Sequence, residues 1–173
     1  LDQLILPKGK WTKIPDYFAA NSQIKTVVLP DNVREIGEYA FAQSDEGHPW
    51  IFTEFRFNKG LQKIGRNAFC NTSPRTSYRD TDNAYELRLP NSITEIGESS
   101  FEGMSGIYSL FIPGSIKKIP RRAFARWTTA RYLTIDEGVE RIEDEAFYQN
   151  GERRSTLYGT LITGVYNYSL PAS

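Results

Sequence analysis

The residue types that most often carry catalysis are scarce in this chain. His48 is the single histidine and Cys70 the single cysteine among 173 residues. A thiol nucleophile needs a base beside it, so a Cys70–His48 pair would require the segment around His48 to fold back beside Cys70. No Gly-x-Ser-x-Gly, His-Glu-x-x-His or phosphate-loop pattern occurs. We therefore predict that the protein is not an enzyme, with Cys70 as a small, partly buried residue and His48 as an exposed loop residue.

Two acidic segments deserve an interpretation as binding sites. Asp80-x-Asp82-Asn83 has the alternating oxygen ligands of calcium loops, but no glycine follows it and no glutamate stands at the required distance. The acidic run from Glu143 to Glu145 begins an expected helical turn, where carboxylates favour the positive helix end. The pair Arg121–Arg122 is interpreted as solvated surface. We expect no metal site and no cofactor.

Composition narrows the classes of partner. The 21 basic and 21 acidic residues cancel, so no long-range field favours nucleic acid or an anionic membrane. No apolar run approaches the ~20 residues that a membrane-spanning helix needs. The lone cysteine excludes an internal disulfide and leaves the redox compartment open. Leu1 already stands at a strand-start position, so we expect the natural protein to continue upstream.

The elements that must position any site come from an internal repeat. Six short segments share an apolar-x-apolar pattern followed by a proline or another strand-breaking residue, which predicts six short strands. The segments span residues 4–7, 27–30, 55–58, 87–90, 110–113 and 133–136. Equivalent positions are usually 23 residues apart, as from Leu89 to Ile112 and on to Ile135. A constant period of this size predicts a solenoid with one coil per repeat.

Two repeats are longer, and the excess residues follow the strand-and-turn unit. Leu29 to Phe57 is 28 residues and Phe57 to Leu89 is 32, so 5 and 9 residues are added. Turn-forming and charged residues cluster at about 44–52 and 72–83, which we interpret as inserted loops. Because these loops leave neighbouring coils, we expect them to meet.

Each strand is followed by an isoleucine and then a phenylalanine preceded by a small residue. The phenylalanines Phe41, Phe69, Phe101, Phe124 and Phe147 are expected to stack from coil to coil. The preceding small residues predict a short α or 3₁₀ turn that closely approaches its neighbour. The segment from Ile14 to Phe18 reads as a shortened first copy. We expect one continuous parallel sheet, with antiparallel pairing possible only in about the last 17 residues.

The unit from Leu89 to Phe124, LPNSITEIGESSFEGMSGIYSLFIPGSIKKIPRRAF, resembles the BspA-like class of leucine-rich repeats. The likeness covers residues 1–157 and leaves 158–173 as a C-terminal cap or the start of a following segment. Glu143 departs from the family's glycine, and Asn58 and Asp136 depart from its proline. The resemblance implies an α/β solenoid: a right-handed coil of about six 23-residue repeats, a parallel sheet on the concave face and short α or 3₁₀ turns on the convex face. It also implies a secreted or cell-surface bacterial protein that adheres to host or bacterial proteins.

Alternation along each strand selects the side chains that point outward on the concave face. The candidate partner-binding residues on this face are Glu54, Arg56, Glu86, Arg88, Phe111 and Tyr132. The first four are expected to form a quartet of alternating charge on adjacent strands, which could equally serve only solubility and register. Exposed aromatic and arginine side chains on a rigid face are the types that dominate interface energies.

The inserted loops offer an alternative site at His48, Trp50 and Tyr78, although neutral drift of a surface loop explains them equally well. The leading hypothesis is a non-enzymatic module that binds a protein or peptide, such as a host extracellular or bacterial surface protein. Two alternatives stay open: an architectural spacer that displays another domain, and a carbohydrate-binding module that uses the aromatic rings as sugar platforms.

Overall fold

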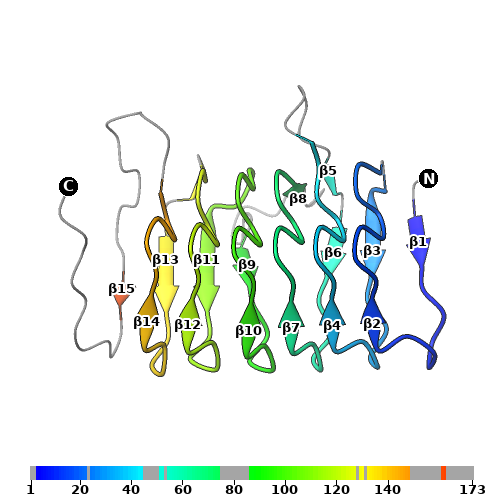
Figure 1. Cartoon of the computed structure of the whole chain (residues 1–173), viewed down its shortest axis with the longest axis horizontal. Helices are drawn as coiled ribbons and strands as arrows, with labels where there is room; N and C mark the ends of the chain where they lie inside the picture. Colours follow the sequence, from blue (N-terminus) through cyan, green and yellow to red (C-terminus); the bar gives the residue numbers. More distant parts are fainter. Residues whose placement is uncertain are drawn as a thin grey trace.

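The chain winds into a row of coils that runs from the N-terminus to the C-terminus in a computed structural model (Figure 1). Each coil carries one strand of a first ladder, a short connection, one strand of a second ladder and a turn segment. The residues that the structure describes are 3–22, 24–44, 51–52, 54–74, 86–127, 129–130, 132–148 and 161–162.

The first ladder consists of the six strands that the repeat pattern predicts and one strand, β15, that it does not predict. They are β1 (Gln3–Ile5), β3 (Thr26–Val28), β6 (Glu54–Arg56), β9 (Glu86–Arg88), β11 (Ser109–Ile112), β13 (Tyr132–Ile135) and β15 (Leu161–Ile162). All of their pairings are parallel, with registers such as Leu4 beside Val27 and Leu110 beside Leu133. Proline follows several of these strands and cannot donate the next ladder hydrogen bond, so the strands are short. Strand β15, the described part of the last 17 residues, pairs with β13 in parallel rather than antiparallel.

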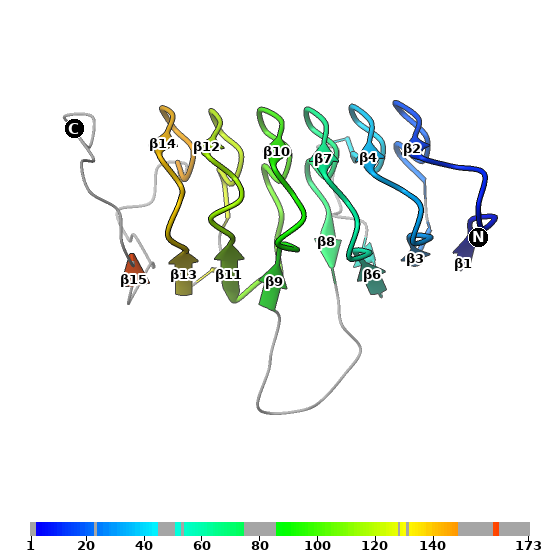
Figure 2. The ribbon, with the colours of Figure 1, turned by 90° about the horizontal axis from the view of Figure 1, so that it is seen from below.

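A second ladder of two-residue strands lies on the other side of the coils and was not predicted (Figure 2). It comprises β2 (Lys13–Ile14), β4 (Glu35–Ile36), β7 (Lys63–Ile64), β10 (Glu95–Ile96), β12 (Lys118–Ile119) and β14 (Arg141–Ile142). In each strand the isoleucine faces the core and the charged residue faces out. The isoleucines from Ile14 to Ile119 are buried, and Ile142 is half-buried. The interior is therefore filled from both sides of the coil.

The inserted segments meet, as expected. Strand β5 (Ile51–Phe52) lies within the first predicted insertion and β8 (Ser73–Pro74) within the second, and the two pair in parallel. This separate two-stranded sheet joins neighbouring coils outside the two main ladders. The domain boundaries drawn from the sequence, 1–157 and 158–173, remain a prediction, as does the right-handed sense of the coil.

The expected short helical turns are wrong. In the part of the chain that the structure describes, no segment forms an α- or 3₁₀-helix, and hydrogen-bonded turns occupy these positions. The reason is a left-handed residue at the same point of every turn, with φ between 53° and 59°, which a right-handed helix excludes. These residues are Tyr17, Tyr39, Asn67, Ser99, Arg122 and Glu145.

The turns are joined to one another by backbone hydrogen bonds. The Phe69 N–H donates to the Ser100 carbonyl at 2.8 Å, and the Phe101 N–H donates to the Ala123 carbonyl at 2.9 Å. The small residues before the phenylalanines, Ala68, Ser100 and Ala123 among them, are fully buried at this approach. The prediction of close approach at the small residues is thus confirmed, although a turn rather than a helix makes it.

The predicted phenylalanine spine is confirmed from Phe41 onward. Successive rings of Phe41, Phe69, Phe101, Phe124 and Phe147 are stacked with centroids 5.3–5.6 Å apart and planes within 13°. Phe18 instead meets Phe41 edge-on at 6.4 Å.

The first copy is not shortened but has two residue types exchanged. The Ala19 N–H donates to the Ala40 carbonyl at 2.7 Å, as Phe41 does to Ala68. Ala19 therefore occupies the phenylalanine position and Phe18 the small-residue position. The reading of a shortened copy was wrong because it aligned residue types rather than hydrogen bonds.

Each ladder has one break, and the two breaks lie at different coil junctions. The first ladder stops between β6 and β9, where the longer insertion intervenes, so the expected single continuous sheet is wrong. The second ladder stops between β10 and β12. In the other coils, Gly65 and Gly97 each donate a backbone N–H to the preceding coil at 2.8 Å. The equivalent residue at this break is Pro120, which has no N–H to donate. At both junctions the other ladder and the turn hydrogen bonds remain.

Candidate functional site

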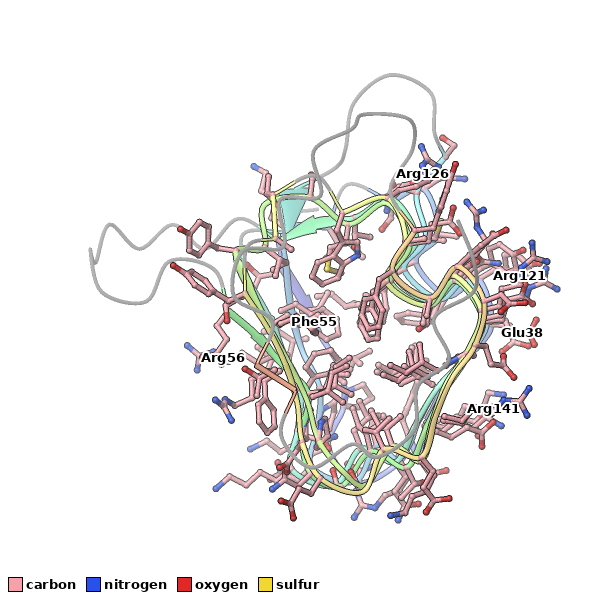
Figure 3. All side chains as sticks on the ribbon, turned by 90° about the vertical axis from the view of Figure 1, so that its left-hand side faces the viewer. Glu38, Phe55, Arg56, Arg121, Arg126 and Arg141 are labelled. Carbon is pink, nitrogen blue, oxygen red and sulfur yellow. The ribbon has the colours of Figure 1, made fainter. Side chains whose placement is uncertain are left out.

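In the first ladder, the outward-pointing residues of neighbouring strands lie beside one another in the predicted register. Phe111 lies beside Arg88 on one side and Thr134 on the other, and Ser109 lies between Glu86 and Tyr132. Figure 3 shows Arg56 pointing away from the coils while the neighbouring Phe55 points into them. We call this outward surface of the first ladder the strand face.

Arg88 is held between two neighbours on the strand face. Its Cζ atom lies 4.1 Å from the centroid of the Phe111 ring, a cation–π contact. Its Nη2 atom donates to Glu86 Oε1 at 3.0 Å. The Arg88 side chain remains 61% exposed, while Phe111 is half-buried beneath it. The strand alternation alone implied that the Phe111 ring is exposed to solvent. The structure shows instead that it is half-buried under Arg88.

Tyr132 lies on the next strand and packs against a residue that the sequence analysis missed. Tyr132 is 48% exposed, and its ring meets Tyr108 edge-on with centroids 5.3 Å apart. Tyr108 was overlooked because it precedes β11 and the simple alternation fails there, with Ile107 and Leu110 both buried. The available signal was its spacing of one 23-residue period from Tyr85.

Three side chains from three paired strands, and a fourth from directly before β11, thus gather on the strand face. We call Arg88, Tyr108, Phe111 and Tyr132 the tyrosine–arginine patch. A small apolar pocket of about 20 Å³ reaches the patch at Tyr132 and is otherwise lined by core residues such as Phe124, Trp127 and Leu133. A volume of this size holds about one water molecule. This pocket is therefore too small for a ligand larger than a water molecule.

The predicted charge quartet does not lie on adjacent paired strands. Strands β6 and β9 are not paired, so Arg56 and Arg88 are not ladder neighbours. Within β9, Glu86 and Arg88 form an ion pair at 3.0 Å. The side chain of Glu54 lies outside the described residues. Toward the N-terminus the strand face is aliphatic, with Ile5 paired to Val28 and exposed by 77% and 46% respectively.

The alternative loop site at His48, Trp50 and Tyr78 lies outside the described residues, as does the Asp80–Asn83 segment. What the structure adds is the pairing of β5 with β8, which brings together the segments next to these residues. Cys70 is half-buried at the end of its turn, which agrees with a structural residue.

On the side of the second ladder, opposite the strand face, basic and acidic side chains of neighbouring strands form ion pairs. Lys13 and Lys63 form ion pairs at 3.0 Å with Glu35 and Glu95 across the second ladder. The hydrogen bond to Glu35 leads the causes that raise the pKa of Lys13 above its ordinary value. Figure 3 shows Glu38, Arg121 and Arg141 on this side, away from Arg56.

The helix-end explanation of the acidic run is wrong, because these residues begin a turn rather than a helix. Glu143 accepts a hydrogen bond from the Arg121 N–H at 3.1 Å and lies 3.3 Å from Lys118. Burial acts to raise the pKa of Glu143, but these contacts, with Arg141 nearby, leave it below its ordinary value. Arg121 and Arg122 both pair with Glu145, so they too are ion-paired rather than simply solvated.

Within the described ranges, no group of three or more His, Cys, Asp or Glu side chains is placed to hold a metal ion. No helix among the residues with a described structure is long and apolar enough to cross a membrane.

Comparison with known proteins places the chain in a family. Neither the curated proteins nor the solved structures gave a match. A family model described as a BspA type leucine rich repeat region matches residues 51–170 in six copies, which is more than half of the chain. The coils before residue 51 share the same ladders and turn hydrogen bonds. The chain belongs to the BspA-type leucine-rich repeat family.

Proposed function

We propose that this chain is a non-enzymatic recognition module that binds a protein or peptide through the tyrosine–arginine patch. The observation that carries the proposal is the gathering of Arg88, Phe111 and Tyr132 on three paired strands, with Tyr108 packed against Tyr132 directly before β11. Tyrosine and arginine are enriched among residues that dominate binding energies at protein interfaces. A repeat solenoid supplies the rigid support that such a cluster needs.

Family membership supports a protein ligand and the absence of catalysis. The resemblance also supports a secreted or cell-surface bacterial setting, in which the module adheres to a host extracellular or bacterial surface protein. Two further hypotheses compete with this proposal. They are an architectural spacer and a carbohydrate-binding module.

The geometry of the patch favours a protein partner over a sugar. A sugar platform needs an aromatic ring with an open, flat face, whereas the Arg88 guanidinium covers one face of Phe111 at 4.1 Å. Tyr108 and Tyr132 pack edge-to-face, with an angle of 61° between their ring planes, so they do not form one flat surface. A spacer, by contrast, has no need of a clustered patch.

The test begins with capture of partners from host extracellular material and bacterial surface extracts on the immobilised 173-residue chain. A captured protein is then purified and titrated against variants. Replacing both Tyr108 and Tyr132 by Ala should weaken binding by about 2 kcal/mol or more, because exposed interface aromatics are lost. The matched control is Tyr17→Ala, which removes a 62% exposed tyrosine from a turn.

Each outcome separates the hypotheses. Equal affinity of the double variant and the control would reject the patch, and loss of binding in Trp50→Ala would move the site to the inserted loops. Binding only to a glycan array would favour the carbohydrate module. Absence of any saturable partner would favour the spacer.

A further inference from the structure

Arg88 is the one member of the tyrosine–arginine patch that carries charge, and its guanidinium is both fixed and exposed. Phe111 supports its flat face, and Glu86 accepts one hydrogen bond from Nη2. A guanidinium has five N–H donors in a rigid fork. Most of these donors therefore remain available at the surface, on a side chain whose orientation is already set.

Such a group selects for a planar anion. Arginine binds carboxylates through two parallel hydrogen bonds, and a guanidinium already held in place loses less conformational entropy on binding. The neighbouring Glu86 carboxylate partly offsets the charge of Arg88. This arrangement favours a singly charged carboxylate over a doubly charged phosphate, which Glu86 would repel more strongly.

The rest of the patch specifies what must accompany the carboxylate. Tyr132 is separated from Arg88 by two strand spacings, from β9 through β11 to β13. Strands in a sheet lie ~4.8 Å apart, and Tyr132 is in register with Glu86, two residues before Arg88. The two backbone positions are therefore roughly 12 Å apart, or about three residues of an extended peptide. An apolar side chain at that distance from the carboxylate would reach the exposed tyrosines.

We propose that the patch binds a peptide segment in which an aspartate or glutamate lies about three residues from an aromatic or large aliphatic residue. The carboxylate pairs with Arg88, and the apolar side chain packs against Tyr108 and Tyr132. This inference rests on the proposed function and names the class of partner for the same site.

The experiment is a selection from a random peptide library displayed on phage, panned against the immobilised chain. Enriched peptides should contain the acidic and apolar pair at the stated spacing. A synthetic peptide of the enriched sequence is then titrated in solution. Arg88→Ala should weaken its binding by about tenfold or more, and Arg88→Lys should recover only part of the loss, since lysine lacks the planar fork.

Three controls make the result specific. Replacing the peptide carboxylate by its amide should cost as much as Arg88→Ala, and the two changes together should cost little more than either alone. Glu86→Gln should tighten binding, because it removes the competing carboxylate. Arg141→Ala removes a 71% exposed arginine from the second ladder and should leave binding unchanged.

The outcomes distinguish this inference from the proposed function. Enriched peptides without an acidic residue, or equal binding by the Arg88→Ala and Arg141→Ala proteins, would overturn the carboxylate specificity while leaving a peptide-binding module. Tighter binding of the synthetic peptide when phosphoserine replaces its acidic residue would overturn it in the same way. No enrichment of any peptide, together with no captured protein, would overturn both.

Discussion

Arg122 binds the carboxylate of Glu102 in the neighbouring coil through two hydrogen bonds, of 2.6 Å from Nη2 and 3.1 Å from Nε. The Glu102 side chain is only 10% exposed. Burial acts to raise the pKa of Glu102. Hydrogen bonds from Arg122 and Ser99, with the charges of Arg122 and Arg126, act to lower this pKa, and their combined effect is the larger. The net result is a pKa below the ordinary value of 4.5.

Stability should therefore fall with acid, and Glu102 should contribute to the fall. A carboxyl group with a lowered folded pKa stabilises the fold above its unfolded pKa and loses that effect as the pH drops through the folded pKa. Glu102→Gln should melt below the wild type at pH 7, and the gap should close as the pH falls below 4.5. Thermal melts across this range measure the effect. The control Glu140→Gln changes a 72% exposed side chain whose ion pair is 3.8 Å long, and should matter little at pH 7. A gap that stayed constant with pH would contradict the role of ionisation.

Removal of one ring from the middle of the phenylalanine spine should be costly. Phe101 is fully buried and stacked between Phe69 and Phe124. Phe101→Ala should lower the free energy of unfolding by about 3–5 kcal/mol, because neighbouring coils cannot close the cavity. Phe18→Ala should cost less, since Phe18 is half-buried and meets Phe41 only edge-on. Chemical denaturation compares the two, and equal losses would show that stacking in the spine is not what matters.

Ser100→Ala should stabilise the protein. The Ser100 hydroxyl is buried without a hydrogen-bond partner, at a position where Ala40, Ala68 and Ala123 stand in other coils. Removing a buried, unsatisfied hydroxyl should raise the free energy of unfolding by about 1 kcal/mol. The control is Ser92→Ala, which should destabilise, since the Ser92 hydroxyl donates to the Leu61 carbonyl at 2.6 Å. Denaturation midpoints shifted in the same direction would refute the distinction.

Gly97 should tolerate no side chain. A Cβ atom there would lie 2.7 Å from the Arg66 Cα atom and 2.7 Å from the Gly65 carbonyl carbon, both on the preceding coil. Gly97→Ala should cost about 2 kcal/mol or more, since backbone on both sides must shift. Gly9→Ala, with nothing within 4 Å of the new Cβ but a φ of +85°, should cost only about 1 kcal/mol. If thermal melts ranked Gly9→Ala as the worse variant, the coils would be less tightly apposed at Gly97 than the structure shows.

The elements with a strong periodic signal were predictable from the sequence. The first-ladder strands, their parallel register and the phenylalanine spine all follow from residues repeated every 23 positions, as at Leu89, Ile112 and Ile135. The second ladder was not predictable by the same reasoning, because two residues such as Lys63 and Ile64 are too few to show an alternation. The left-handed turns escaped as well, since Tyr39, Arg122 and Glu145 are not residues that favour a positive φ.

The candidate site was only half visible in the sequence. Arg88, Phe111 and Tyr132 could be placed on one face from alternation alone, and the structure brings them onto paired strands. Their mutual arrangement could not be predicted, because the support of Arg88 by Phe111 depends on side-chain rotamers. The absence of ladder pairing between β6 and β9 could not be predicted either, because the strand pattern is the same on both sides of the insertion.

The staggering of the two ladder breaks has a mechanical consequence. Where the first ladder is interrupted between β6 and β9, the β7–β10 pairing of the second ladder still joins the two coils. Where the second ladder is interrupted between β10 and β12, the β9–β11 pairing of the first ladder joins them. No plane of weakness crosses the whole molecule between its described coils. A pulling force applied along the row of coils should therefore meet resistance at both interrupted junctions.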